Sequence, residues 1–518
     1  MLLRLILFAA VLAVALFAVL AAMVSWPLPE APRLGVAGDF LIRGVTVVDV
    51  EAGRLEPGRD VLVRGGRIAA VEASGSVEAQ SGLQVIDGRG RFLIPGLWDM
   101  HTHSTTLSAQ YQHPLFIANG VTGVRDLWGC MSEPDPFFAC IDDRRRWNAA
   151  LAAGEGLTPR YVGQSSYQIN GGDEVPEGYP AFFRARTADE ARRLVDYYDQ
   201  AGADILKIYS DLSPEAYVAL AAEAGRRGLR VEGHRPVRVS LEAMLDAGQR
   251  SVEHARLFLL ECYAGAQAFR ALPDPLAAYT PDLRARLVDG QDEARCGRLI
   301  GRLAESDTWW TPTLQTLRMG ALAADPAFRS DPRLQYVPYV FSKLMWEPDA
   351  DRMAASATDA SGRNVHTALY RLALDHVGRA HAAGARILTG TDAFDTYVFP
   401  GFSTHDELVE LVAAGLSPAD ALRSATIDAA IFSGVEEAYG SIAPGKAADL
   451  LLLGADPLLD VGNTRQIDGL FFNGRYFDRP SLDRLLEFAA QQAGSVRANL
   501  QIIWRAVRSP LLRLQFAD

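Results

Sequence analysis

The spacing of apolar and polar positions changes twice within the amino-terminal part of this 518-residue chain. Residues 5–24 form an unbroken apolar run, which as a helix at about 1.5 Å per residue spans the hydrocarbon part of a bilayer. Between residues 40 and 95, branched apolar residues alternate with polar residues or glycine, a pattern that predicts short β-strands. From residue 96 to about residue 434, short apolar stretches alternate with helix-length segments.

The long alternating part predicts strands that are each followed by a helix, and therefore a closed parallel (β/α)8 TIM barrel in an α/β protein. The eight expected strands are 97–103, 121–125, 161–164, 205–209, 230–234, 251–254, 309–313 and 387–392. Strand-like sequence returns at 449–453 and 469–472. A small β-sandwich domain is therefore expected from the segments that flank the barrel.

This pattern divides the chain into five parts. They are an N-terminal transmembrane anchor or uncleaved signal (1–25), the first part of the β-sandwich (35–95), the barrel (96–436), the second part of the sandwich (437–480) and a C-terminal helical segment (481–518). The last segment carries several arginines. A basic helix can lie on a membrane surface, but we favour an ordinary helix that is solvated or packed against the barrel.

The apolar run near the amino terminus has two interpretations. A cleaved signal usually has a core of about 7–15 apolar residues followed by small residues, and this run is longer and its end fits such a site poorly. We therefore favour a membrane anchor, with Arg4 in the cytoplasm and the folded domains on the periplasmic or extracytoplasmic side. If the segment is cleaved, the protein is secreted.

The four cysteines agree with export. Pairing Cys130 with Cys140 and Cys262 with Cys296 closes short loops, so we favour it among the three possible pairings. Four reduced, buried thiols are the alternative.

Composition excludes two classes of protein. An apolar fraction of 49% with 22% charged residues is globular rather than disordered. The net charge of −12 offers no basic face, so no nucleic acid is expected as a partner. The expected partners are a small-molecule substrate and, through the N-terminal helix, a membrane, whereas the oligomeric state is not predicted.

Side chains that could bind a metal ion lie at the carboxyl ends of the expected strands. His101 and His103 lie two apart on the first strand, so both face the same way, and paired imidazoles suit a cation such as zinc. His234, His254 and Asp392 end the fifth, sixth and eighth strands. Each histidine alone is an ordinary buried side chain, but strand ends converge on one pocket in a barrel, so their joint position indicates a metal site.

Lys207 lies within the apolar fourth strand. Burial disfavours its charged form, and a neutral amine can take up CO2 to become a carbamate, an anionic ligand that could bridge two cations. The alternative is a buried ion pair with Asp392 or another carboxylate.

Together these motifs resemble the amidohydrolase superfamily, closest to its imidazolonepropionase-like and prolidase-like branch. The resemblance extends from about residue 40 to residue 479 and is carried by residues 94–103, 120–126, 205–209, 389–392, 425–426 and 440–450, with His234 and His254. It implies a binuclear site in which one divalent ion is held by His101, His103 and Asp392 and the other by His234 and His254, with carboxylated Lys207 between them. Zinc is expected, although iron, manganese or cobalt suit the same ligands.

The resemblance implies a hydrolase acting on a C–N bond of an amide, cyclic amide or dipeptide. A metal-bridging hydroxide would attack the carbonyl, and Asp392 would transfer the proton to the leaving nitrogen. The alternatives are a lactonase or phosphotriesterase-type ester hydrolase and, of a different class, a non-catalytic membrane-tethered binding protein.

Substrate contacts are less clearly marked. Some prolidase-like relatives have a histidine in a Gly-Gly-His stretch, whereas the matching residues 168–173 contain none. Gln168 in that stretch, Tyr209 on the inward face of the fourth strand, and His405 after the eighth strand are the candidates for contact with substrate.

Overall fold

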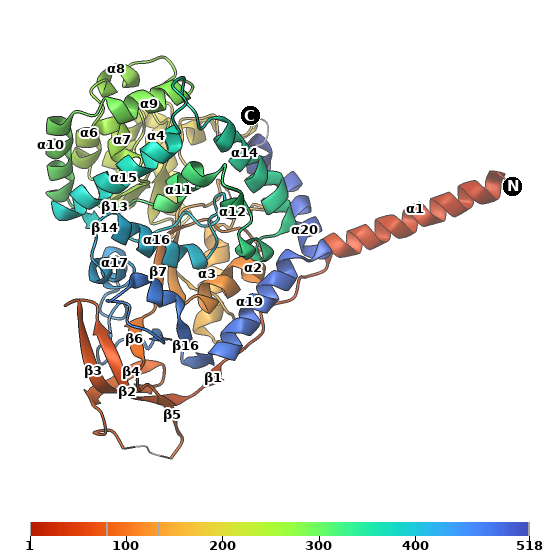
Figure 1. Ribbon diagram of the computed structural model, residues 1–518. Coiled ribbons are helices and arrows are strands. Elements are labelled where there is room, and N and C mark those ends of the chain that lie inside the picture. Colours follow the sequence, from red (N-terminus) through yellow and green to blue (C-terminus); the bar gives the residue numbers. More distant parts are fainter. Residues whose placement is uncertain (1, 79–80, 133, 516–518) are drawn as a thin grey trace.

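The computed structural model describes residues 2–78, 81–132 and 134–515. They form a mixed α/β fold with a strand-rich end, a helix-covered body and an amino-terminal helix that projects away from both (Figure 1).

One sheet combines the strand-rich segments from the two flanks of the sequence. β6 (Phe92–Pro95) pairs antiparallel with β15 (Leu450–Leu453), so the two segments meet as predicted. The strand order is β1-β17-β16-β15-β6-β2-β3-β4, with β5 beside β2. The other strands are β1 (Val36–Ala37), β2 (Asp39–Asp49), β3 (Arg54–Arg64), β4 (Arg67–Ala73), β5 (Leu83–Asp87), β16 (Ile467–Phe472) and β17 (Arg475–Asp478). Alternate residues of β2 such as Phe40 and Ile42 enter a hydrophobic cluster of this sheet, which accounts for the period of two in the sequence.

The body contains two parallel sheets whose strands follow the order of the sequence. The first comprises β7 (Leu97–Thr102), β8 (Val121–Asp126) and β9 (Arg160–Tyr161), and the second β10 (Ile205–Ile208), β11 (Arg230–Gly233), β12 (Ser251–Glu253), β13 (Trp309–Thr311) and β14 (Arg386–Ile387). Isolated parallel bridges, Ser165 to Ile205 and Thr102 to Ala393, connect the two sheets at both edges. Every residue of β7, β8, β10 and β12 is buried, as expected for strands covered on both faces.

Two of the eight expected strands are reduced to two residues each. The third, expected over 161–164, is reduced to β9, and the eighth, expected over 387–392, to β14. After β14 the chain leaves the extended conformation, and Asp392 has a φ of 68°. Gly390 packs so closely on β7 that an added Cβ would lie 2.9 Å from the amide nitrogen of His101. This close approach, rather than a regular ladder, brings Asp392 beside His101.

Helices cover the two parallel sheets on their outer side (Figure 1). Side chains cap the first turns of several of these helices: Ser213 accepts a hydrogen bond from the amide of Ala216, and Asn364 accepts one from the amide of Thr367. The helices that follow the strands are α2 (Ser108–Ala118), α3 (Ile141–Ala152), α4 (Ala188–Gln200), α5 (Pro214–Arg227), α6 (Leu241–Asp246), α10 (Glu293–Ala304), α15 (Val365–Ala382), α16 (Phe402–Ala413), α17 (Pro418–Ser424) and α18 (Ile427–Ser433). Inserted between them are α7 (Leu257–Glu261), α8 (Ala266–Arg270), α9 (Pro281–Asp289), α11 (Leu314–Leu322), α12 (Pro326–Arg329), α13 (Tyr339–Phe341), α14 (Glu347–Ala355) and the short helices η1 (Ala181–Arg184), η2 (Pro332–Tyr336), η3 (Ser342–Trp346) and η4 (Val461–Arg465).

The predicted apolar helix at the amino terminus is α1 (Leu2–Ser25). Its segment Leu3–Ser25 is long and apolar enough to cross a membrane, and none of its most apolar stretch is buried in the protein; a signal sequence has the same properties. At the other end of the chain lie α19 (Arg479–Ala493), α20 (Val496–Arg508) and α21 (Pro510–Gln515). α19 packs against α2, and α20 contacts α1 (Figure 1).

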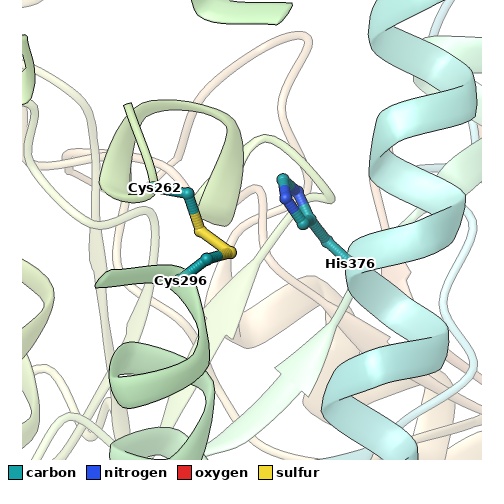
Figure 2. Close-up of side chains that lie close together, drawn as sticks. All are labelled: Cys262, Cys296 and His376. Carbon is teal, nitrogen blue, oxygen red and sulfur yellow. A yellow bond between two sulfur atoms is a disulfide. The ribbon is translucent and has the colours of Figure 1, made fainter. Parts of the chain in front are cut away.

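Both favoured disulfides are present, Cys130–Cys140 and Cys262–Cys296, so the alternative of four reduced thiols is wrong. His376 of α15 lies beside the second disulfide (Figure 2). Because both sulfur atoms are committed to the disulfide, this group lacks the thiolates that a metal ion would need.

The buried ion pair between Arg160 and Asp449 joins the first parallel sheet to the strand-rich end, with Arg160 Nε 3.0 Å from Asp449 Oδ2. We expect Asp449→Asn to lower the free energy of unfolding by about 2–3 kcal/mol, because it leaves a mostly buried guanidinium without its counter-charge. The matched control is Asp468→Asn, which breaks the more exposed pair with Arg91 and should cost less than about 1 kcal/mol. Denaturant unfolding of the three proteins measures both values, and equal losses would contradict a linking role for Asp449.

Candidate functional site

The six predicted metal-binding residues line one cavity of about 530 Å³. His101 belongs to β7 and Lys207 to β10. The other four follow strand ends: His103 follows β7, His234 follows β11, His254 follows β12 and Asp392 follows β14. The structure therefore brings together, at the carboxyl ends of the parallel strands, side chains that are spread over the sequence from residue 101 to residue 392.

The polar atoms of these residues are close to one another. Asp392 Oδ1 lies 2.5 Å from His103 Nε2 and 3.3 Å from His101 Nε2. The Nε2 atoms of His234 and His254 are 2.9 Å apart, and Nζ of Lys207 is 3.5 Å from His101 Nε2. Imidazole nitrogens and a carboxylate oxygen in such proximity form a donor set that suits a borderline-soft divalent cation. His101, His254 and Asp392 alone present ligand atoms within 4.8 Å of one another and could hold an ion.

Unusual backbone conformations direct several of these side chains. His254 and Asp392 have φ angles of 72° and 68°, in the left-handed region that non-glycine residues rarely occupy. Gly233 also has a positive φ, and a Cβ there would lie 2.4 Å from the carbonyl oxygen of Ile208. Such strain persists only where the surrounding structure enforces it, and it is concentrated at functional sites.

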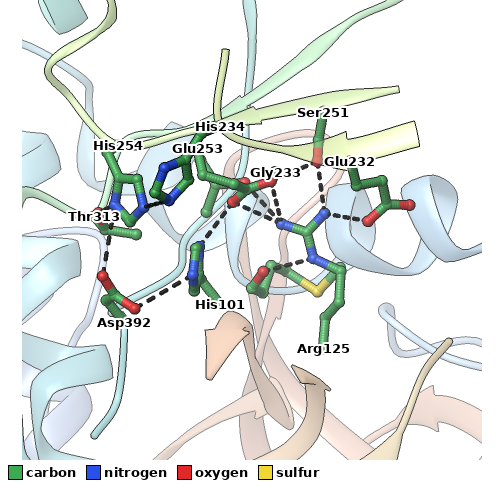
Figure 3. Close-up of polar contacts among 12 residues, drawn as sticks. His101, Arg125, Glu232, Gly233, His234, Ser251, Glu253, His254, Thr313 and Asp392 are labelled. Atoms are coloured by element: carbon green, nitrogen blue, oxygen red, sulfur yellow. Dashed lines mark hydrogen bonds and ion pairs between the residues drawn. The ribbon is translucent and has the colours of Figure 1, made fainter. Parts of the chain in front are cut away.

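Hydrogen bonds on the far side of the rings orient the histidines (Figure 3). His101 Nδ1 is 2.9 Å from Glu253 Oε2, and His254 Nδ1 is 2.8 Å from Thr313 Oγ1. Nδ1 of His234 bonds to Ser210 in the same way. These contacts leave Nε2 of each of the three rings facing the cavity, while Nδ1 of His254 also lies 3.6 Å from Asp392 Oδ2.

Sequence reasoning missed the charged cluster that holds Glu253. The guanidinium of Arg125 donates to Glu253 and to Glu232, and all three side chains are buried (Figure 3). The available signal was the presence of charged residues inside apolar strands, such as Glu253 directly before His254. Charges in such positions need partners.

Burial determines the protonation of the candidate ligands. It lowers the pKa of His234 and His254 well below the usual value, so these rings are neutral, as imidazoles must be to bind a metal ion. Burial, helped by the charge of Lys207, lowers the pKa of His101 to about 4. The pKa of Lys207 falls to about 8, again through burial. Burial opposes ionisation of Asp392, but His101 and His103 together hold its pKa well below the usual range.

Two of the three predicted substrate contacts reach this cavity. Tyr209 and Gln168 line it, and the ring of Tyr209 stacks on His234 with centroids 4.1 Å apart. The third prediction, His405, is wrong in position. It is buried in α16, where its ring nitrogens bond to Thr464 Oγ1 and to the carbonyl of Asn119, and it does not line the cavity.

Part of the cavity wall is apolar, although Thr105, Arg256 and Thr316 also line the cavity. The apolar lining residues were not identified from the sequence: two of them directly follow β8, and the others come from loops and inserted helices. The lining side chains beyond the predicted ones include Leu127, Trp128, Phe137, Phe341, Met345 and Phe394. Asp395 also lines the cavity, and burial together with the charge of Asp392 raises its pKa to about 6.

Comparison with known proteins indicates a hydrolase related to amidohydrolases. The model of the Amidohydrolase family matches residues 363–476. An adenine deaminase of Paracoccus denitrificans (strain Pd 1222) is 43% identical over 65 residues, a match that covers 12% of this chain and only 11% of that protein.

Solved structures resemble the chain over most of its length. Bottromycin amidohydrolase has a TM-score of 0.64 at 23% identity, covering 92% of this chain and 94% of its own. A protein of Bifidobacterium longum provisionally assigned as a prolidase has a TM-score of 0.60 at 24% identity, covering 88% of this chain and 99% of its own. At these identities the likeness shows the fold. With the family match it confirms the predicted resemblance to the amidohydrolase superfamily.

The contact between Glu253 and His101 predicts a measurable effect on metal binding. We expect Glu253→Gln to weaken divalent-metal affinity about 10- to 100-fold, because the ring of His101 loses the partner that fixes its orientation. Competition with a chromophoric chelator measures this affinity without a substrate.

Glu232→Gln is the matched control, since Glu232 bonds to Arg125 but not to His101. The metal affinity of this variant should stay within about threefold of the affinity of the unmodified protein. If both variants lose affinity equally, the cluster supports the fold in general and Glu253 has no specific role at His101.

Proposed function

We propose that this protein is a metal-dependent hydrolase that cleaves the C–N bond of an amide, a cyclic amide or a dipeptide. The convergence of His101, His103, Lys207, His234, His254 and Asp392 on one cavity is the observation that carries the proposal. The match to the Amidohydrolase family supports it, as does the likeness to a Xaa-Pro dipeptidase structure with a TM-score of 0.59 at 18% identity.

We further propose that the two parallel sheets are one closed eight-stranded barrel, and that the flanking strands form the β-sandwich. The bridges between Ser165 and Ile205 and between Thr102 and Ala393 support closure, because they join the two sheets at both edges. The division into an anchor (1–25), sandwich segments (35–95 and 437–480), a barrel (96–436) and a helical end (481–518) follows from this arrangement.

In the proposed site, His101, His103 and Asp392 hold one divalent cation, and His234 and His254 hold the other. A neutral amine on Lys207 adds to the carbon of CO2 and releases one proton, which gives a carbamate able to bind both ions. When bound, the cations, which we expect to be zinc, polarise the substrate carbonyl and lower the pKa of water towards neutrality.

The protein's own groups would then guide the proton and the substrate. Asp392, ionised and beside His103, accepts a proton from the attacking water at a carboxylate oxygen and passes it to the leaving nitrogen. Tyr209 and Gln168 border the space for the substrate. The apolar wall that includes Trp128 and Phe341 favours a substrate with an apolar group next to the scissile bond.

We also propose that α1 anchors the enzyme with its folded part on the periplasmic or extracytoplasmic side. The two disulfides support this location, because disulfides persist in oxidising compartments.

A substrate panel tests the proposed reaction. N-acyl amino acids and dipeptides should be hydrolysed by the full chain, the activity should disappear with a chelator, and added zinc should restore it. Hydrolysis of lactones or phosphotriesters alone would replace the amidase proposal with an ester hydrolase. A metal-replete protein that hydrolyses nothing on the panel would contradict the proposal and favour a binding protein.

Asp392→Asn tests the proton transfer. We expect turnover to fall at least about 100-fold while metal remains bound, because the amide keeps the shape of the side chain but has no basic oxygen. The matched control is Asp395→Asn, a second carboxyl group lining the cavity, which should lose less than about tenfold. Near-full activity of Asp392→Asn would exclude Asp392 as the base.

A further inference from the structure

Helix α20 exposes several large apolar side chains to the outside of the protein. Val496, Ile503, Trp504 and Val507 are 69%, 40%, 46% and 59% exposed. They recur at spacings of three, four and seven residues, so they form one stripe along the helix. The side of α20 that faces the protein carries the buried side chains of Ala498, Asn499, Gln501 and Ile502. The helix therefore has a buried face and, in addition, an exposed apolar stripe, which a surface helix of a soluble domain normally lacks.

Polar contacts attach α20 to the base of α1. Nε2 of Gln501 donates to the carbonyl oxygens of Met23 and Trp26 at 3.0 and 2.7 Å, and Nη2 of Arg497 donates to that of Pro27 at 2.7 Å. The two helices meet where α1 leaves the body of the protein (Figure 1). The exposed stripe therefore lies at the level at which an anchored α1 would leave the bilayer.

Arginine and tryptophan side chains lie in and beside the exposed apolar stripe. Arg508 is exposed, and its guanidinium lies 5.5 Å from the centre of the Trp504 ring. Trp26, at the end of α1, is 68% exposed. Tryptophan prefers the boundary between lipid and water, and arginine there contacts anionic headgroups while its stem covers apolar surface.

We propose that the outer face of α20 lies in the interface of the lipid bilayer that α1 enters. Val496, Ile503, Trp504 and Val507 are immersed at the boundary of the acyl chains, and Arg497 and Arg508 contact lipid phosphates. The proposal rests on the proposed anchor and adds to it a second, lateral contact that fixes the orientation of the body on the membrane.

This orientation has a consequence for the cavity. The amide of Val340 in α13 donates to Oδ1 of Asn499, and the neighbouring Phe341 lines the cavity. One short segment thus separates the membrane-facing helix from the apolar wall of the site. A substrate dissolved in the bilayer would have a short path to the proposed site.

The test uses the full chain in lipid nanodiscs of phosphatidylethanolamine and phosphatidylglycerol. All four native cysteines are in disulfides, so an introduced cysteine carries the only free thiol for an NBD fluorophore. The test variant is Val507→Cys, and the matched control is Val218→Cys on α5, since these valines are 59% and 55% exposed. Val496→Cys probes the other end of the stripe.

We expect lipids with a spin label near the headgroup to quench NBD at positions 507 and 496 at least about twofold, and iodide to quench it weakly, as for a helix at the acyl-chain boundary. At position 218 iodide should quench strongly and the lipids should not. Iodide access at 507 equal to that at 218 would overturn the proposal. Protection from iodide without quenching by lipid would also overturn it and indicate a second copy of the chain on this face. Incorporation into nanodiscs and hydrolysis by the same samples test the anchor and the enzyme separately.

Discussion

The rest of the structure depends on the buried guanidinium of Arg125, which connects the two parallel sheets. It belongs to β8 and donates hydrogen bonds to Glu232 of β11, Glu253 of β12 and Thr311 of β13, and also to the backbone of β7. One side chain thus links strands of both parallel sheets beneath the cavity. An unpaired charge in this position would cost several kcal/mol, so the folded protein requires the two carboxylates. Glu253 in turn orients His101, which couples the stability of the core to the geometry of the site.

Much of the candidate site could be predicted from the sequence, for a physical reason. Residues at the carboxyl ends of parallel strands converge whatever the loops between them do. His234 and His254 were therefore recognisable from the short strands that precede them. Asp392 was recognisable too, although its strand is much shorter than expected and a close backbone approach to His101 brings it into position.

Other features depend on contacts that the sequence does not encode locally. The carboxylate partners of Arg125 lie more than one hundred residues away in the sequence, so no spacing rule identifies them. The position of His405 was predicted wrongly because the sequence does not show which face of a helix is buried. The ring lies on the buried face of α16 and bonds to residues from distant segments. The apolar wall of the cavity comes from inserted segments, where apolar residues are equally expected in ordinary packing. The outward-facing stripe of α20 is visible as a periodic pattern, but the structure was needed to show which side is exposed.

The proposed hydrolase mechanism requires that the cavity hold two metal ions. The metal content of the purified full chain tests this requirement most directly. Inductively coupled plasma mass spectrometry on protein produced with zinc and bicarbonate should find about two divalent ions per chain, as two-metal hydrolase sites bind. Lys207→Met should lose most of this metal while keeping its fold. Less than about half an ion per chain in the unmodified protein, or an unchanged content in the variant, would contradict the account.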